Sequence, residues 1–193
     1  MAPEKTRGPL KRALLSASVI GVSLAMLSCA TTRGRWADGW YTEQLHLKGA
    51  EDSEEIELRY QPGGLGASWQ ESPSPTGDIA FYSQEIGATI YADSSCAARY
   101  EDAPLQVLLN HLLFGFTEVE LSDQRERELA GRAALTRSAS AQLDGVPVEV
   151  AATVTKNGPC VFDLVFIGPP GSLDTGESHY ESFLSGLTVE YQP

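Results

Sequence analysis

The stretch AALTRSASAQLDGVPVEVAATVTKNGPCVFDLVFI, residues 133–167, decides the fold that the sequence predicts. It consists of three strand-like runs separated by Asp144-Gly145 and Asn157-Gly158. These dipeptides tolerate the positive φ angles that two-residue hairpin turns require, so the three runs are expected to form an antiparallel meander. The last run, Cys160 to Ile167, is almost continuously apolar, which is typical of a central strand buried on both faces.

Helical patterns stand on both sides of this meander. Upstream, Asp102 is a candidate N-cap, Pro104 suits a first turn and Gly115 suits a helix end. The apolar stripe of this helix consists of Leu105, Leu108, Leu109, Leu112 and Leu113. Downstream, a second helix is expected from Asp174 to Ser185, stopped by Gly186. Its apolar residues are Tyr180, Phe183 and Leu184.

Further strands are expected outside the meander, where apolar residues alternate with polar ones between Gly and Pro turns. They are Ile56–Tyr60, Leu65–Trp69, Asp78–Ser83, Gly87–Ala92, Phe116–Leu121 and Leu187–Tyr191. The run Arg125-Glu126-Arg127-Glu128 alternates in charge and is expected to lie exposed.

This order of strands, helix, meander, helix and strand predicts an α+β fold. We expect one antiparallel β-sheet with helices on both faces, an α/β/α sandwich. From about Gly87 to Glu190 the order resembles the PsbP-like family, with Leu143-Asp144-Gly145 at a hairpin and the helix of Tyr180 and Phe183 before a last strand. The resemblance implies an envelope or lumenal adaptor more often than an enzyme, although fold likeness alone does not carry function.

The start of the chain has the layout of a secretory signal. A basic beginning with Lys5, Arg7, Lys11 and Arg12 precedes the apolar run Ala13–Leu27. The tetrapeptide Met26-Leu27-Ser28-Cys29 resembles a bacterial lipobox. This resemblance implies cleavage after Ser28, thioether lipidation of Cys29 and acylation of the new amino terminus.

An ordinary or uncleaved secretory signal is the alternative. A transmembrane anchor is not expected, because the apolar run is shorter than the roughly 20 residues that a membrane span needs. Two or more acyl chains would make the anchoring stable. By resemblance to proteobacterial lipoproteins, Ala30 after the cysteine implies sorting to the outer membrane. The predicted organisation is a lipoprotein signal peptide over residues 1–28, a lipidated tether over 29–38 and a single domain over 39–193.

The charge balance excludes some partners. The chain has 14 Lys and Arg against 26 Asp and Glu, a formal charge of −12. Removing residues 1–28 takes away four basic residues and one acidic residue, leaving 10 against 25. This balance argues against nucleic acid, which is bound by neutralising phosphates, and against docking on an anionic bilayer. A basic partner, a divalent cation and simple solubility remain open.

Cys96 and Cys160 are expected to form a disulfide, because the cell envelope is an oxidising compartment. Two buried free thiols are the alternative. A catalytic thiol is not expected, since no His or Asn stands in a recognisable motif near either cysteine.

Motifs for catalysis, cofactors or metals are not found in the sequence, so no catalytic, cofactor-binding or metal residue is assigned. His46, His111 and His179 lie far apart and no metal-type spacing links them. The acidic run Glu51–Glu57 lacks the pattern of a calcium loop, and we expect an exposed strand edge there. Trp36 is expected either at the membrane interface or packed on the domain.

The sequence therefore predicts a lipid-anchored, periplasm-exposed lipoprotein that binds another envelope protein and is not an enzyme. The alternative is a carrier or accessory factor for a lipid or another apolar ligand. An exposed apolar patch would favour the adaptor and an enclosed apolar cavity the carrier. A polar cleft with shifted pKa values would favour an enzyme.

Overall fold

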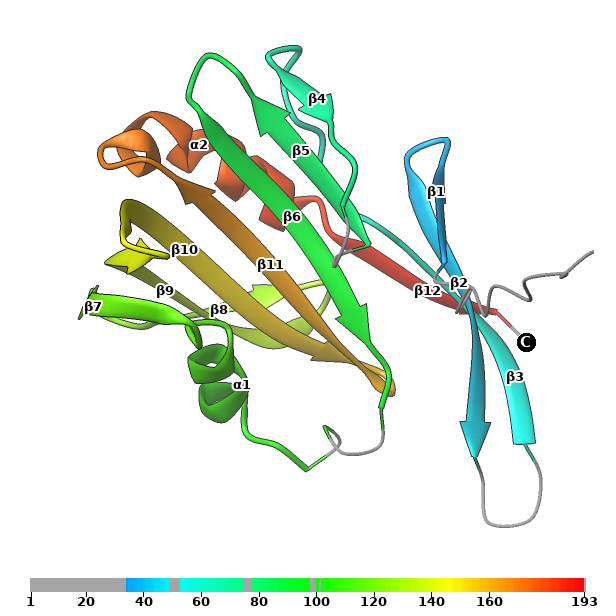
Figure 1. The fold of residues 1–193 in the computed structure, drawn as a ribbon. Coiled ribbons are helices and arrows are strands. Elements are labelled where there is room, and N and C mark those ends of the chain that lie inside the picture. The colour runs from blue at the N-terminus through cyan, green and yellow to red at the C-terminus, as the bar shows by residue number, and fades with distance from the viewer. Residues whose placement is uncertain (1–33, 49–52, 75–77, 98–99, 101, 193) are drawn as a thin grey trace, which may run out of the picture. The chain divides into compact units, whose positions relative to one another are not determined.

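The computed structural model describes residues 34–48, 53–74, 78–97, 100 and 102–192. Within these ranges the chain forms twelve strands and two helices, and the strands make one four-stranded and one eight-stranded antiparallel sheet (Figure 1). The predicted signal peptide and the lipidation site Cys29 lie outside the described residues.

The eight-stranded sheet contains the predicted meander. Its order is β4-β5-β6-β11-β10-β9-β7. β8 pairs with the first residues of β9, and β7 pairs with the last residues of the same edge. The bounds are β4 (Trp69–Glu71), β5 (Ile79–Ser83), β6 (Ala88–Ser95), β7 (Phe116–Leu121), β8 (Arg125–Leu129), β9 (Arg132–Leu143), β10 (Val146–Asn157) and β11 (Cys160–Gly168). Asp144 and Gly145 have positive φ angles and form the two-residue turn between β9 and β10, which confirms the first predicted turn. The second hairpin is in the predicted place, but its turn is Gly158-Pro159, because Asn157 pairs with Cys160 and only Gly158 has a positive φ. The predicted central position of β11 is also confirmed, because it lies between β10 and β6.

The four-stranded sheet was not predicted as a separate unit. Its order is β1-β2-β3-β12, with β1 (Arg35–Ala37), β2 (Trp40–Lys48), β3 (Ser53–Gln61) and β12 (Thr188–Gln192). β1 belongs to the stretch that the sequence places in the tether. There the Trp36 ring meets the Phe81 ring edge-on at 5.9 Å between centroids, so Trp36 packs on the domain.

The two helices are α1 (Leu105–His111) and α2 (Ser172–Ser185). The expected bounds of α1 are wrong: Pro104 is its N-cap, no side chain caps it, and it ends four residues before Gly115. The expected end of α2 is confirmed, because Gly186 follows its last residue, although the helix begins two residues before Asp174.

The predicted α/β/α sandwich is wrong. Strands make up most of the described residues and form two sheets, so the fold is β-rich. The seven-residue α1 covers only part of β9 and β10, and α2 covers parts of β6, β10 and β11. The apolar stripe of a helix shows that this face must be buried against another element. It does not show whether helices or a second sheet bury the rest of the core.

The core lies in two clusters on the two sides of the eight-stranded sheet. Along β10, Val150, Ala152 and Val154 pack with Leu108 and Leu109 of α1. The intervening residues of β10 point to the other side, as strand pleating requires. That side holds the larger cluster, which includes Tyr60, Phe162, Phe166, Tyr180 and Phe183. The ring of Tyr60 meets Phe162 at 5.2 Å between centroids, which joins the four-stranded sheet to this cluster.

Several smaller expectations have clear outcomes. The disulfide is confirmed: Cys96, just after β6, is bonded to Cys160 at the start of β11. The expected strand over residues 65–69 is wrong, because β4 starts only at Trp69. The expected exposure of residues 125–128 is confirmed for Arg125, Glu126 and Glu128. Arg127 is only partly exposed, and its guanidinium donates to both carboxylate oxygens of Glu181 at 2.9 and 2.6 Å.

Candidate functional site

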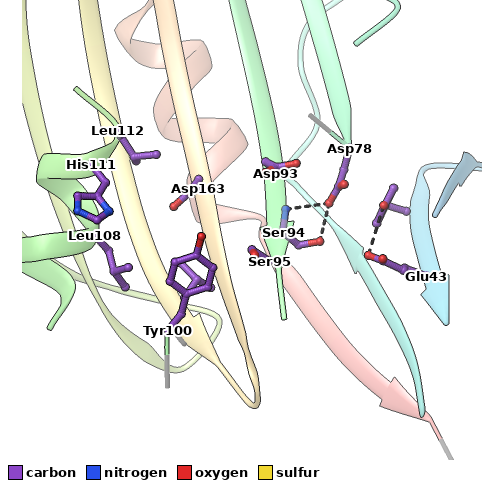
Figure 2. Close-up of a pocket in the computed structure, with 12 residues that line it drawn as sticks. Glu43, Asp78, Asp93, Ser94, Ser95, Tyr100, Leu108, His111, Leu112 and Asp163 are labelled. Carbon is purple, nitrogen blue, oxygen red and sulfur yellow. Dashed lines mark hydrogen bonds between the residues drawn. The ribbon is translucent and has the colours of Figure 1, made fainter. Parts of the chain in front are cut away.

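A cavity with an acidic lining, called here the acidic cavity, has a volume of about 450 Å³. Figure 2 shows side chains of α1 on one side of it and Glu43 of β2 on the other. Its acidic residues come from four separate segments. The lining residues are Tyr41, Glu43, Asp78, Asp93, Ser94, Ser95, Tyr100, Leu108, His111, Leu112, Val161 and Asp163.

Asp78 holds one wall of the acidic cavity together. One of its carboxylate oxygens accepts hydrogen bonds from the Tyr60 hydroxyl at 2.7 Å, the Ser94 amide at 2.8 Å and the Ser94 hydroxyl at 2.5 Å (Figure 2 shows the two from Ser94). Burial, together with the charge of Asp78, raises the pKa of Tyr60 well above its ordinary value, so this phenol stays a donor. Asp78 thereby links β3 to β6, which is a structural role.

Asp163 is a carboxyl group of the acidic cavity whose pKa lies near neutral pH. It stands opposite Asp93 in the pairing of β11 with β6. Burial, and secondly the charge of Asp93, raise the pKa of Asp163 to about 7. This carboxyl group therefore exchanges its proton near neutral pH, as a general acid or base does.

The histidines are not brought together by the fold. His111 lines the acidic cavity, whereas His46 is exposed and pairs with Glu55 at 3.0 Å from Nε2 to Oε1. His179 lies against the ring of Trp69 on another part of the domain. Among the described residues, no group of three or more His, Cys, Asp or Glu side chains could hold a metal ion.

Sequence reasoning missed the acidic cavity because its carboxylates come from distant strands. The sequence nevertheless contained one indication of this site. Asp163 interrupts the otherwise apolar strand β11, and a charged residue there is costly unless it has a role.

A second surface lies at the β7 edge of the eight-stranded sheet. Three large apolar side chains on neighbouring strands are exposed there, and we call them the β7 apolar surface: Val146 is 61% exposed, Leu121 52% and Leu143 37%. Phe114, two residues before β7, is 78% exposed. Leu143 stands opposite both Phe116 of β7 and Val146 of β10, and Leu121 opposite Ala139. Cross-strand partners share a face of a sheet, so this surface continues the α1-side core beyond the end of the short helix.

A third surface is a groove of about 530 Å³ with several aromatic walls. Trp36, Trp69, Phe81 and Leu65 supply its apolar side chains, and the backbone around Gly63 and Gly64 forms part of its wall. We call it the aromatic groove. Its lining therefore combines aromatic rings with backbone atoms of the segment around Gly63 and Gly64.

Comparison with known proteins supports the fold without supplying a family. The sequence matches no known protein-family model, and no curated protein matches it. Among solved structures, the chain is similar to LpqN, which is involved in cell envelope biogenesis of Mycobacterium tuberculosis. The identity is 14% over 80% of this chain and 92% of that one, with a TM-score of 0.54. At this identity the likeness shows the fold alone.

Two other solved structures are also similar. Cyanobacterial PsbP (CyanoP) from Synechocystis sp. PCC 6803 is 15% identical over 77% of this chain and 92% of that one, with a TM-score of 0.48. A protein of unknown function from Pseudomonas aeruginosa, PA94, is 17% identical over 72% and 91%, with a TM-score of 0.42. A cyanobacterial PsbP protein is thus among the similar solved structures.

None of the helices within the described residues is both long enough and apolar enough to cross a membrane.

Proposed function

We propose that this chain is a membrane-anchored, periplasm-exposed lipoprotein whose domain binds another envelope component and catalyses no reaction. Lipid on Cys29 holds it at the outer membrane, and the β7 apolar surface contacts a protein partner. Tethering raises the effective concentration of the domain for a partner in the same membrane.

The β7 apolar surface is the observation that carries this proposal. Leu121 of β7, Leu143 of β9 and Val146 of β10 are exposed on one face of the sheet, and Phe114, two residues before β7, exposes most of its surface. Single exposed apolar residues need no explanation, but large ones gathered on one face mark interaction sites. The similar fold of LpqN, a protein of envelope biogenesis, supports looking for the partner in the envelope.

Site-specific photo-crosslinking in intact cells tests the proposal. A photoreactive amino acid replaces Leu121 or Val146 in the full-length chain. Tyr82, which is 42% exposed on β5, serves as the matched control position. We expect both surface positions to capture the same envelope protein and position 82 not to capture it. No adduct, or the same adducts from all three positions, would show that the β7 apolar surface is not the binding site.

A carrier of a lipid or another apolar ligand is the second candidate, and the aromatic groove is the observation that favours it. Trp36, Trp69 and Phe81 offer the rings that an apolar ligand would contact. Mass spectrometry of the native protein, taken from membranes in mild detergent, separates the two candidates. Bound lipid beyond the acyl chains on Cys29, without a protein partner, supports the carrier, whereas a stoichiometric protein supports the adaptor.

The acidic cavity meets one condition for an enzyme, because Asp163 has a raised carboxyl pKa within a polar cleft. Both described cysteines are consumed in the disulfide, and the cavity contains only one of the three histidines. We therefore keep the non-enzymatic proposal.

A further inference from the structure

Strand β7 forms an open edge of the eight-stranded sheet. It pairs with β9 on one side, and no strand among the described residues pairs with its other side. Such an edge presents unpaired backbone N–H and C=O groups, which can pair with an added strand.

The two faces beside this edge have opposite character. Register places Leu121 with Ala139 on the α1 side, next to the β7 apolar surface. Glu120 stands opposite Ser140 on the α2 side. Glu118 lies on that side too, because its carboxylate accepts a hydrogen bond from the side-chain amide of Gln142. Thus β7 separates an apolar face from an acidic one.

The acidic face is also hollowed. A groove of about 310 Å³ runs beside β7, and Glu120, Glu149 and Asp174 supply its carboxylates. Among the described residues that line this groove, none is Lys or Arg. The arginines of the neighbouring strand β8 are engaged elsewhere, Arg125 with Glu177 and Arg127 with Glu181. The groove therefore has an unbalanced negative charge.

We propose that β7 binds an extended segment of a protein partner in which apolar residues alternate with Lys or Arg, added to the sheet as a further strand. This proposal rests on the proposed function and names the chemistry of the partner. Side chains of an added strand point alternately to the two faces. The apolar ones would meet Phe116 and Leu121, and the basic ones would meet Glu120 and the groove beside it.

Charge selects this occupant over a second copy of the chain. Antiparallel pairing of two β7 strands in one continuous sheet would bring the Glu118 and Glu120 side chains of both copies to the same face. Like charges across a strand pair destabilise it, whereas opposite charges stabilise it. The formal charge of −12 adds long-range repulsion between copies and attraction for a basic segment.

The bulge in β7 is compatible with an added strand. The register with β9 shifts between Thr117 and Glu120, and Glu118 has a φ of 50°. Bulges blunt an edge against indiscriminate pairing. Pairing with β7 therefore requires a segment that fits the bulge and also alternates apolar with basic side chains, so the edge selects its partner.

The test uses the full-length protein in mild detergent and a fluorescent, end-capped peptide of eight residues with alternating Val and Lys. A peptide of four Val followed by four Lys has the same composition and is the first control. A peptide of alternating Val and Glu is the second. Fluorescence anisotropy measures affinity, and hydrogen–deuterium exchange of residues 116–121 reports strand pairing.

We expect the alternating Val–Lys peptide to bind more tightly than both controls, to weaken with added salt, and to slow exchange in β7. Glu120→Lys and Leu121→Lys should each weaken binding by about fivefold or more. Glu85→Lys and Tyr82→Lys are matched control variants at exposed positions on and beside β5, and they should leave affinity unchanged. Unchanged exchange in β10 and β11 would show that the variants remain folded.

The strand proposal is overturned if the Val–Lys peptide does not bind at about 1 mM, if the block peptide binds equally well, or if exchange in β7 does not change. Dimerisation through β7 would overturn it as well. If these results occur while Leu121 still crosslinks to an envelope protein, only the strand mode fails. If the crosslink is also absent, the proposed function fails with it.

Discussion

Asp163 of β11 lies directly opposite Asp93 of β6, so two carboxyl groups stand side by side on adjacent central strands of the larger sheet. The burial of Asp163 disfavours its ionised form, and the charge of Asp93 adds to this effect. The pKa of Asp163 is consequently raised to about 7. A pair of this kind costs stability when both members are ionised.

We predict that Asp163→Asn removes a pH-dependent loss of stability. In the wild type the folded protein binds the Asp163 proton more tightly than the unfolded chain, whose Asp pKa is about 4. This favours folding at pH 4 and is lost as the pH rises through about 7. The free energy of unfolding of the variant, relative to the wild type, should therefore rise between pH 4 and pH 8. Denaturant titrations at several pH values measure the difference.

Gln70→Ala is the control for this prediction, because Gln70 is exposed and has no titratable group. Its difference from the wild type should be nearly constant over the same pH range. A constant difference for Asp163→Asn would mean that Asp163 is ionised throughout.

The disulfide should make a large contribution to stability. Cys96 and Cys160 are separated by 64 residues, and closing a loop of this size restricts the unfolded chain. We expect replacement of both cysteines by alanine to lower the free energy of unfolding by about 4 kcal/mol. Urea denaturation with and without reductant measures this. The reductant should destabilise the wild type and leave the variant unaffected, and equal sensitivity of the two would contradict the assignment.

Gly176 of α2 should not tolerate a methyl group. A Cβ there would lie 2.4 Å from the ring of Phe166, which is fully buried in the larger core cluster. The strain outweighs the helix-propensity gain from alanine, so Gly176→Ala should be destabilising by about 1–2 kcal/mol. Gly64→Ala is the matched control, because nothing lies within 4 Å of a Cβ at that position. Similar melting temperatures for the two variants would show that the helix moves freely over β11.

The membrane anchor can be tested by Cys29→Ser. The sequence resemblance implies that this thiol carries lipid, and loss of the acyl chains removes stable anchoring. We expect the variant to leave the membrane fraction and remain folded. The membrane-extracted wild type should show the mass of lipid on the cysteine. A variant that still pellets with membranes, together with a wild type free of lipid mass, would contradict the lipoprotein assignment.

Local features of the fold could be predicted because they depend on neighbours in the chain. Positive φ angles at Asp144, Gly145 and Gly158 set the two hairpins, and Gly186 ends α2. The apolar run of β11 correctly indicated a strand buried between two others. The oxidising compartment implied by the signal indicated the bond between Cys96 and Cys160.

Features that depend on distant strands were missed. Leu187–Tyr191 was recognised as strand-like, but only pairing with β3 shows that β12 belongs to a second sheet. The charge alternation of residues 125–128 correctly indicated that most of this run is exposed, but it gave no sign that Arg127 is partly buried and bonded to Glu181 of α2, 54 positions away. Strand order and such contacts are set by the free energy of the whole core and not by local periodicity.

The sequence by itself determined the turns, the central strand, the end of α2, the acidic charge and the cysteine pair, because each follows from local stereochemistry or composition. Only the tertiary structure decided that there are two sheets, that Asp93 and Asp163 meet, and that Leu121, Leu143 and Val146 lie exposed on one face of an open edge. Those relationships join residues far apart in the chain, and they arise when the buried surface of one strand selects its neighbours.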